Sequence, residues 1–163
     1  MTRLTAFVVP AFLFLLSVPA VSLGQDAAAI EKTISDTAKA FTEFPRTRDK
    51  QALLRAYTKD YAGIQDGEVE TLARTEEWLA GLEEQLKLGK PIGIVAQVRN
   101  VKVHSSGAFA WATYDYEFKV GEAGNVVQED SGMCTSILRK DGTAWLIQHE
   151  HCSIPNRSRF GMK

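Results

Sequence analysis

The chain has 163 residues, of which 45% are hydrophobic and 24% charged, and 19 basic side chains nearly balance 20 acidic ones for a formal net charge of -1. This composition is typical of one globular domain, and with 2 cysteines and 12 glycines it excludes a disulfide-dense miniprotein and a collagen-like repeat. The missing basic surplus argues against nucleic acid as a partner, because neutralising phosphates requires excess lysine and arginine.

Residues 1–24 are predicted to form a secretory signal peptide. Arg3 supplies a basic start, a mostly apolar run covers residues 6–18, and small residues two apart follow at Ala20 and Ser22. The run is short for a membrane span of about 20 residues, although an uncleaved anchor is the alternative. We therefore expect a secreted or periplasmic protein without membrane contact after cleavage, with its domain at residues 25–157 and a short tail at 158–163.

The first half of the mature chain is predicted to be helical. Apolar residues recur at helical spacing over residues 26–44, ahead of Pro45. A short second helix is expected to carry Leu53, Leu54 and Tyr57 on one stripe, because charged residues occupy its other side.

A third helix is expected after a short strand at residues 61–64. Thr75 is its predicted cap, since two glutamates follow in the first turn, where the helix dipole favours negative charge. This helix would bury Trp78 and Leu82 and end at Gly89.

From residue 92 onward the apolar period changes to two, which predicts long strands. We expect these strands at about residues 94–104, 108–120, 126–139 and 144–153. Helices followed by such a meander predict an α+β domain whose sheet curls over the helices. The strands are apolar on both faces, so we expect a homodimer that packs through the sheet.

Cys134 and Cys152 are predicted to be buried free thiols, although export would permit a disulfide between them. A two-residue turn at residues 141–142 would place Cys134 opposite His149. The two thiols would then point to opposite faces of the sheet, in a geometry that cannot form a bond. A bulge near residues 143–144 would alter this register.

The last hairpin carries a resemblance to a known family. Its pattern Trp-x-Ile-x-His-x-His-x-Ser over residues 145–153, followed by Pro155, resembles the end of SnoaL-like domains in the nuclear transport factor 2-like superfamily. It is most similar to the association domain of calcium/calmodulin-dependent protein kinase II and to DUF4440-type bacterial relatives. Residues 53–60 also resemble the second helix of this family, where a tyrosine precedes an acidic residue.

This resemblance implies an α+β fold in which a cone-shaped, strongly curved antiparallel sheet wraps around three N-terminal helices, with a pocket between them. It implies no cofactor and no single reaction, since relatives include isomerases, cyclases, dehydratases and assembly modules. Thr135 and Cys152 stand where the kinase association domain has pocket arginines, which argues against recognition of a small acid at those positions.

Aromatic side chains and one carboxylate are the first candidates for a site in that pocket. Tyr57, Trp78 and Tyr114 would give it an apolar lining, and Thr135 would lie among them. Asp115 is the candidate general base, because a carboxylate desolvated between aromatic neighbours can take up a proton at neutral pH. Alternatively, Asp115 is solvated or lies at a subunit interface.

His149 and His151 are the second candidates, because residues two apart on a strand share a face, here expected to be that of Trp145 and Ile147. Either imidazole can carry a proton near pH 7. With His104 they would offer three ligands to zinc, but in the resembling family such a pair serves packing and hydrogen bonding, and we expect no metal. Gln148 and Glu150 alternate with these histidines and would line the pocket if the histidines faced outward.

Two functions fit this sequence. The first is an exported pocket protein that binds a small, mostly apolar molecule, with or without proton-transfer chemistry of the isomerase, cyclase or dehydratase type. The second is a non-catalytic dimerisation module whose pocket has no role.

Overall fold

A computed structural model describes residues 23–65 and 67–154. In chain order the elements are α1 (Leu23–Thr47), α2 (Lys50–Leu54), β1 (Tyr57–Gln65), β2 (Glu68–Thr71), α3 (Leu72–Lys87), β3 (Ile92–Ser106), β4 (Phe109–Glu122), β5 (Asn125–Asp141) and β6 (Ala144–Ser153). The expected signal peptide, up to residue 22, and the expected C-terminal tail lie outside the described residues. Within the described ranges, no helix is long and apolar enough to cross a membrane.

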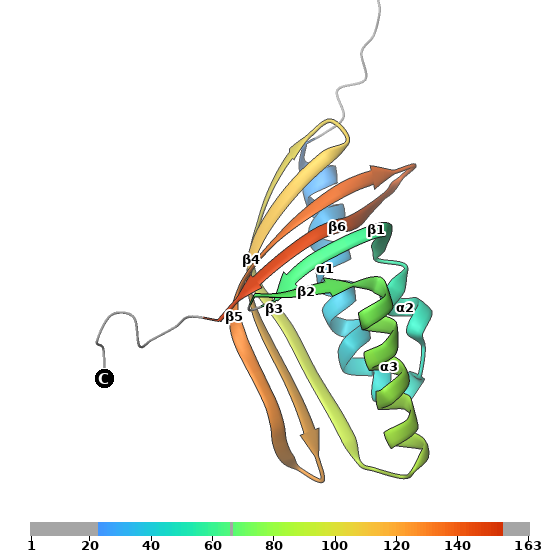
Figure 1. The fold of residues 1–163 in the computed structure, drawn as a ribbon. Helices are drawn as coiled ribbons and strands as arrows, with labels where there is room; N and C mark the ends of the chain where they lie inside the picture. The colour runs from blue at the N-terminus through green and yellow to red at the C-terminus, as the bar shows by residue number, and fades with distance from the viewer. Residues whose placement is uncertain (1–22, 66, 155–163) are drawn as a thin grey trace, which may run out of the picture.

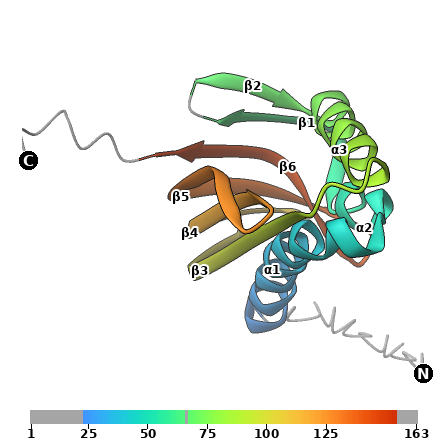
Figure 2. The same cartoon turned by 90° about the horizontal axis from the view of Figure 1, so that it is seen from below.

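The strands form one curved, open sheet of 6 strands in the order β2-β1-β6-β5-β4-β3 (Figure 1). Strands β3 to β6 make an antiparallel meander, while β1 pairs with β6 in parallel and with β2 in antiparallel orientation. Helix α1 lies along the β3 side of the sheet, and α2 and α3 lie beyond one end of it (Figure 2). The predicted α+β class is confirmed, with one parallel pairing that the meander did not predict.

Helix α1 is tied to the last hairpin near its N-terminal end. The Asp26 carboxylate accepts hydrogen bonds from Lys140 Nζ at 2.7 Å and from Trp145 Nε1 at 3.0 Å. These bonds lower the pKa of Asp26 from its ordinary value, and the bond from Lys140 has the largest effect. Ile30 and Ile34, farther along the helix, are buried against the sheet.

Apolar side chains form two buried clusters between the helices and the sheet. The first joins α1 to β4, β5 and β6 through Ile30, Ile34, Ala110, Ala112, Leu138, Trp145 and Ile147. The second joins all three helices to β3 and β4 through Phe44, Leu53, Leu79, Leu82, Ile94 and Val120. Each large side chain buried in this way stabilises the fold by about 1.5–3 kcal/mol.

The second predicted helix is shorter than expected. Asp49 caps it by accepting a hydrogen bond from Ala52 N at 3.0 Å, and the helix ends at Leu54. Tyr57 therefore begins β1 and does not extend the helical stripe, because Ile147 N donates a hydrogen bond to Ala56 O at 2.8 Å and draws the chain onto the sheet.

The third helix begins one turn earlier than predicted. Thr71, not Thr75, is its cap and accepts a hydrogen bond from Arg74 N at 3.3 Å, while the Thr75 hydroxyl bonds back to Thr71 O. Leu79 and Leu82 are its buried residues, whereas Trp78 keeps 37% of its surface exposed. The prediction of a buried Trp78 was wrong, because this side chain borders a cavity.

The predicted strands after residue 92 are confirmed, and β6 has the predicted bounds. The sequence did not predict β2, since its four residues Glu68–Thr71 are largely polar and pair only with β1. It also predicted too short a β1, because this strand departs from regular pairing between Tyr57 and Ala62.

The predicted register of the last hairpin was wrong. Asp141 pairs with Ala144 and Leu138 with Ile147, but Ile137 then pairs with His149, so Gln148 is an extra residue in β6. This bulge brings Cys134 directly opposite Cys152, with a Cα–Cα distance of 4.1 Å. The two cysteines form a disulfide, contrary to the expected free thiols, because the bulge turns both side chains to one face.

Candidate functional site

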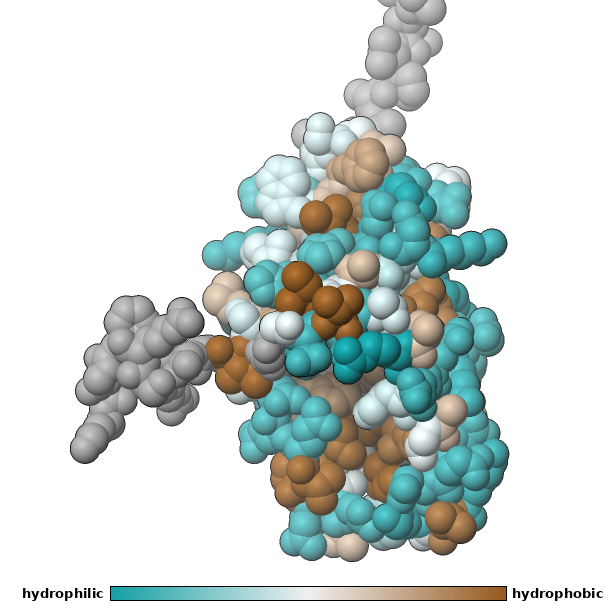
Figure 3. All heavy atoms as spheres, viewed as in Figure 1, coloured by the Kyte–Doolittle hydropathy of each residue, from teal (hydrophilic) through white to brown (hydrophobic). Residues whose placement is uncertain are grey.

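A cavity of about 310 Å³ lies between the curved sheet and helices α1 and α3. Figure 3 shows a hollow on the face drawn in Figure 1, with hydrophobic side chains in its depth. The size is at the lower end of the range of ligand pockets. Along α1, its lining residues run from Ile34, in the first buried cluster, through Ala38 to Phe41, which packs against the second cluster. The cavity therefore lies where the core divides.

One side of the cavity is an aromatic wall made by Phe41 of α1, Trp78 of α3 and Phe118 of β4. Their ring centroids are 6.2 Å apart for Phe41 and Trp78, 5.6 Å for Phe41 and Phe118, and 6.1 Å for Trp78 and Phe118. The two contacts of Phe41 are edge-to-face, and such contacts stabilise a structure beyond the effect of the surface area they bury. The wall therefore joins three elements and offers a preformed apolar surface.

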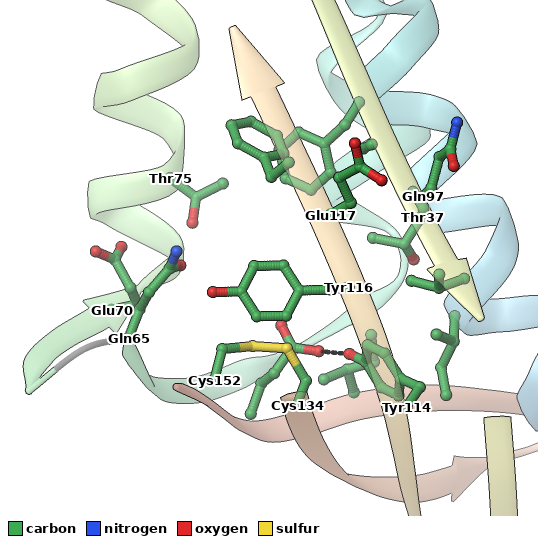
Figure 4. Close-up of a pocket in the computed structure, with 18 of the residues that line it drawn as sticks. Thr37, Gln65, Glu70, Thr75, Gln97, Tyr114, Tyr116, Glu117, Cys134 and Cys152 are labelled. Carbon is green, nitrogen blue, oxygen red and sulfur yellow. Dashed lines mark hydrogen bonds between the residues drawn. A yellow bond between two sulfur atoms is a disulfide. The ribbon is translucent and has the colours of Figure 1, made fainter. Parts of the chain in front are cut away.

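At the opposite end lies a polar floor made by Tyr114 of β4 and Glu150 of β6. The fully buried Ser136, on the intervening strand β5, is hydrogen-bonded to this floor. Glu150 Oε1 accepts hydrogen bonds from the Tyr114 hydroxyl and, at 2.7 Å, from the Ser136 hydroxyl. The two hydroxyl oxygens are also 2.9 Å apart. Figure 4 shows Tyr114 in this arrangement, close to the disulfide of Cys134 and Cys152.

Neutral phenol groups surround this floor. Burial raises the pKa of Tyr57 well above its ordinary value, and the nearby Glu150 charge raises it further. The pKa values of Tyr61 and Tyr114 are raised by the same two causes, with burial first. Tyr57 and Tyr61 pack with ring centroids 4.6 Å apart. At neutral pH these side chains are therefore uncharged and able to donate hydrogen bonds.

The Gln148 bulge decides which side chains of β6 face the cavity. Before the bulge, Trp145 and Ile147 are buried against α1; after it, Glu150 and Cys152 line the cavity. His149 and His151 consequently lie on the other face. The prediction that they share the face of Trp145 and Ile147 was wrong, because the extra residue inverts the alternation.

Four of the predicted site residues line the cavity: Tyr57, Trp78, Tyr114 and Glu150. Of Gln148 and Glu150, which were expected to line the pocket if the histidines faced outward, only Glu150 is among the described lining residues. Gln148 instead donates a hydrogen bond to Asp60 at 3.2 Å.

The remaining predicted residues lie away from the cavity lining. Thr135 pairs with His151, and Ile137 with His149, on the face opposite the helices. Asp115 accepts a hydrogen bond from Asn100 Nδ2 at 2.6 Å. The catalytic roles of Asp115, His149 and His151 stay predictions.

The sequence did not single out Ser136, Tyr61 or Glu70 as site residues. Ser136 pairs with Glu150 across β5 and β6, a relationship that depends on the bulge. Tyr61 lies in the irregular part of β1, and Glu70 lies in the unpredicted β2. No local pattern marks these positions.

The zinc alternative is not supported by the placement of the histidines. The His104 ring stacks on Trp111 with centroids 5.0 Å apart. Across residues 23–65 and 67–154, no three His, Cys, Asp or Glu side chains are grouped so that they could hold a metal ion.

Residues 34–157 match the family model of the SnoaL-like domain. The chain belongs to the SnoaL-like family. The resemblance of the last hairpin is thereby confirmed at the level of the family and of the nuclear transport factor 2-like superfamily. No curated protein sequence matches this SnoaL-like chain.

Solved structures share the fold of this SnoaL-like domain. A conserved protein from Planctomyces limnophilus is similar with a TM-score of 0.64 at 21% identity, over 81% of this chain and 98% of that one. An NTF2-like protein of unknown function from Pseudomonas putida has a TM-score of 0.58 at 19% identity, over 81% and 88%. A protein from Novosphingobium aromaticivorans, provisionally named a scytalone dehydratase, has a TM-score of 0.60 at 12% identity, over 80% and 85%.

Proposed function

We propose that this SnoaL-like domain binds a small, mostly apolar molecule in the cavity between the sheet and the helices. The observation that carries the proposal is the combination of an aromatic wall with a single polar floor at Glu150. Ligand pockets are typically apolar with a few convergent polar groups that fix orientation. The apolar body would contact Phe41, Trp78 and Phe118, and a polar group would meet Glu150.

We further propose that any proton-transfer chemistry uses Glu150, in place of the sequence candidates Asp115, His149 and His151. Glu150 borders the cavity, and a base must lie within hydrogen-bond reach of the proton that it takes. The neutral hydroxyl groups of Tyr57 and Tyr61 are suited to stabilise developing negative charge. Two fold neighbours that are provisionally named dehydratases are consistent with such chemistry.

We also propose that two copies of the chain pair through the sheet face that carries Trp111 and Ile137. These two residues are directly paired across β4 and β5, and 48% and 40% of their surfaces are exposed. Met133, on the same face of β5, is 57% exposed. Large apolar side chains grouped on one face favour a protein partner. This dimer would leave the cavity on the opposite face open.

Export remains part of the proposal. A disulfide between Cys134 and Cys152 is favoured in an oxidising compartment, such as the periplasm or the extracellular space. Fractionation of cells that produce the full chain, with N-terminal sequencing of the product, tests this point.

Blocking the cavity tests ligand binding. Ala38→Phe on α1 and Thr75→Phe on α3 each insert a ring from a different side, and Ala73→Phe on the exposed side of α3 is the matched control. Native mass spectrometry should find a bound molecule, and thermal-shift screening of small aromatic compounds should find stabilising ligands, for the wild type and the control only. Equal binding by both blocked variants would contradict the proposal.

A further inference from the structure

We propose that the ligand of this cavity is an organic cation, a protonated amine on an apolar body, bound between the Glu150 carboxylate and the surrounding aromatic rings. This inference rests on the proposed binding function and adds the charge of the ligand.

The charged side chains that line the cavity are all acidic. Among its described lining residues are Glu70, Glu117 and Glu150, but no lysine, arginine or histidine. Glu117 is neutralised by ion pairs with Arg99 at 2.8 Å and Lys119 at 2.7 Å. Among the described residues, the only cationic partner of Glu70 is Arg74, at the longer distance of 3.8 Å. The cavity is therefore electronegative, which disfavours an anionic ligand.

Among residues 23–65 and 67–154, the groups that donate hydrogen bonds to the Glu150 side chain are hydroxyl groups only. Both of its bonds, from Tyr114 and Ser136, end on Oε1. Within the described part of the chain, no cationic side chain forms an ion pair with Glu150, and Oε2 accepts no hydrogen bond. A partly buried carboxylate without a cationic partner is costly to desolvate. An ammonium group that contacted Oε2 would supply the missing positive charge.

The surroundings of Glu150 also suit a cation. Tyr57, Tyr61 and Tyr116 line the cavity beside the polar floor, and the faces of aromatic rings attract a desolvated cation. Figure 4 shows the Tyr116 ring above the disulfide in this view, with its hydroxyl group directed toward the side of Gln65 and Glu70. The aromatic wall at the other end would hold the apolar body of the same molecule. An ammonium group beside Glu150 with a carbon skeleton toward Trp78 thus matches both ends of the cavity.

Three probes of equal framework and different charge test this inference: 2-phenylethylammonium, 2-phenylethanol and phenylacetate. Isothermal titration calorimetry on the purified full-chain product should give the ammonium at least about tenfold higher affinity than the alcohol, since an ion pair and cation–π contacts are gained. Phenylacetate should not bind. The comparison with the alcohol is the decisive one, because the alcohol can still donate a hydrogen bond to Glu150 and differs from the ammonium in charge.

Glu150→Gln removes the charge but keeps the acceptor for Tyr114 and Ser136. It should lower the affinity for the ammonium by about tenfold and leave that for the alcohol within about threefold. Glu31→Gln, on the exposed side of α1, makes the same change in net charge and should alter neither. If Glu150→Gln fails to fold, Tyr61→Leu, which removes an aromatic face beside the polar floor, should reduce ammonium binding more than alcohol binding.

The possible results separate the two proposals. Alcohol binding as tight as ammonium binding, or ammonium binding that is unaffected by Glu150→Gln, overturns the cationic ligand and leaves the binding pocket standing. Failure of all three probes to bind counts against the cationic ligand, whereas the blocked-cavity variants decide the binding function separately.

Discussion

Gln148 donates a hydrogen bond to Asp60 at 3.2 Å, across strands β6 and β1, at the point where both strands leave regular pairing. Arg139 of β5 reaches the same carboxylate at 3.2 and 3.3 Å. Asp60 thus links three neighbouring strands on the face opposite the helices. The bulge at Gln148, which Asp60 contacts, directs Glu150 into the cavity. The hydrogen bond between Gln148 and Asp60 on one face of the sheet therefore stabilises the geometry of the site on the other face.

Replacing Asp60 by alanine should lower the free energy of unfolding, because the donors on Gln148 and Arg139 lose their acceptor at an exposed position. The same variant should weaken ligand binding through the displaced Glu150. Urea denaturation and probe titration measure the two effects. Asp36→Ala, which removes an exposed ion pair with Lys32 on α1, is the control and should change stability by less than about 0.5 kcal/mol.

The disulfide between Cys134 and Cys152 should contribute about 2–4 kcal/mol to the stability of the domain, since it closes a loop with a sequence separation of 18. Urea denaturation with and without a reductant measures this difference. The Cys134→Ala/Cys152→Ala double variant should be insensitive to the reductant. Two titratable thiols in the unreduced, denatured protein would be incompatible with the disulfide.

Leu79 and Leu88 distinguish the buried and exposed sides of the α3 region. Leu79→Ala should destabilise the protein by about 2–5 kcal/mol, because Leu79 is fully buried among Phe44, Leu53 and Leu82. Leu88→Ala should cost less than about 0.5 kcal/mol, because Leu88 is 77% exposed. If chemical denaturation gave equal losses of unfolding free energy for the two variants, this would contradict the burial of Leu79 and the exposure of Leu88.

Asp26 should make stability depend on pH in the acid range. Its pKa in the folded protein is lowered from 3.8, chiefly by the hydrogen bond from Lys140 and then by that from Trp145. A depressed folded pKa means that the stabilisation is fully present above the unfolded value and is lost as pH falls through the folded value. The stability difference between wild type and Asp26→Asn should therefore be constant from pH 7 to about 5 and shrink below about pH 4. A difference that grew on acidification would contradict the assignment.

The local pattern of the sequence was sufficient to predict the class of the fold. Helical spacing before residue 88 and alternation after residue 92 are properties of consecutive residues, so the α+β order and the bounds of β6 follow from them. The last hairpin also carried enough of the family pattern to indicate the SnoaL-like domain.

The face on which each functional side chain lies was decided only by tertiary structure. One extra residue at Gln148 inverts the alternation in β6, joins Cys134 to Cys152 and turns Glu150 inward and His149 outward. Such a bulge is set by pairing with β5 and with the irregular β1, whose residues are distant in sequence. Because strand register depends on these long-range contacts, the sequence determined which elements form, and the assembled sheet determined which carboxylate meets the cavity.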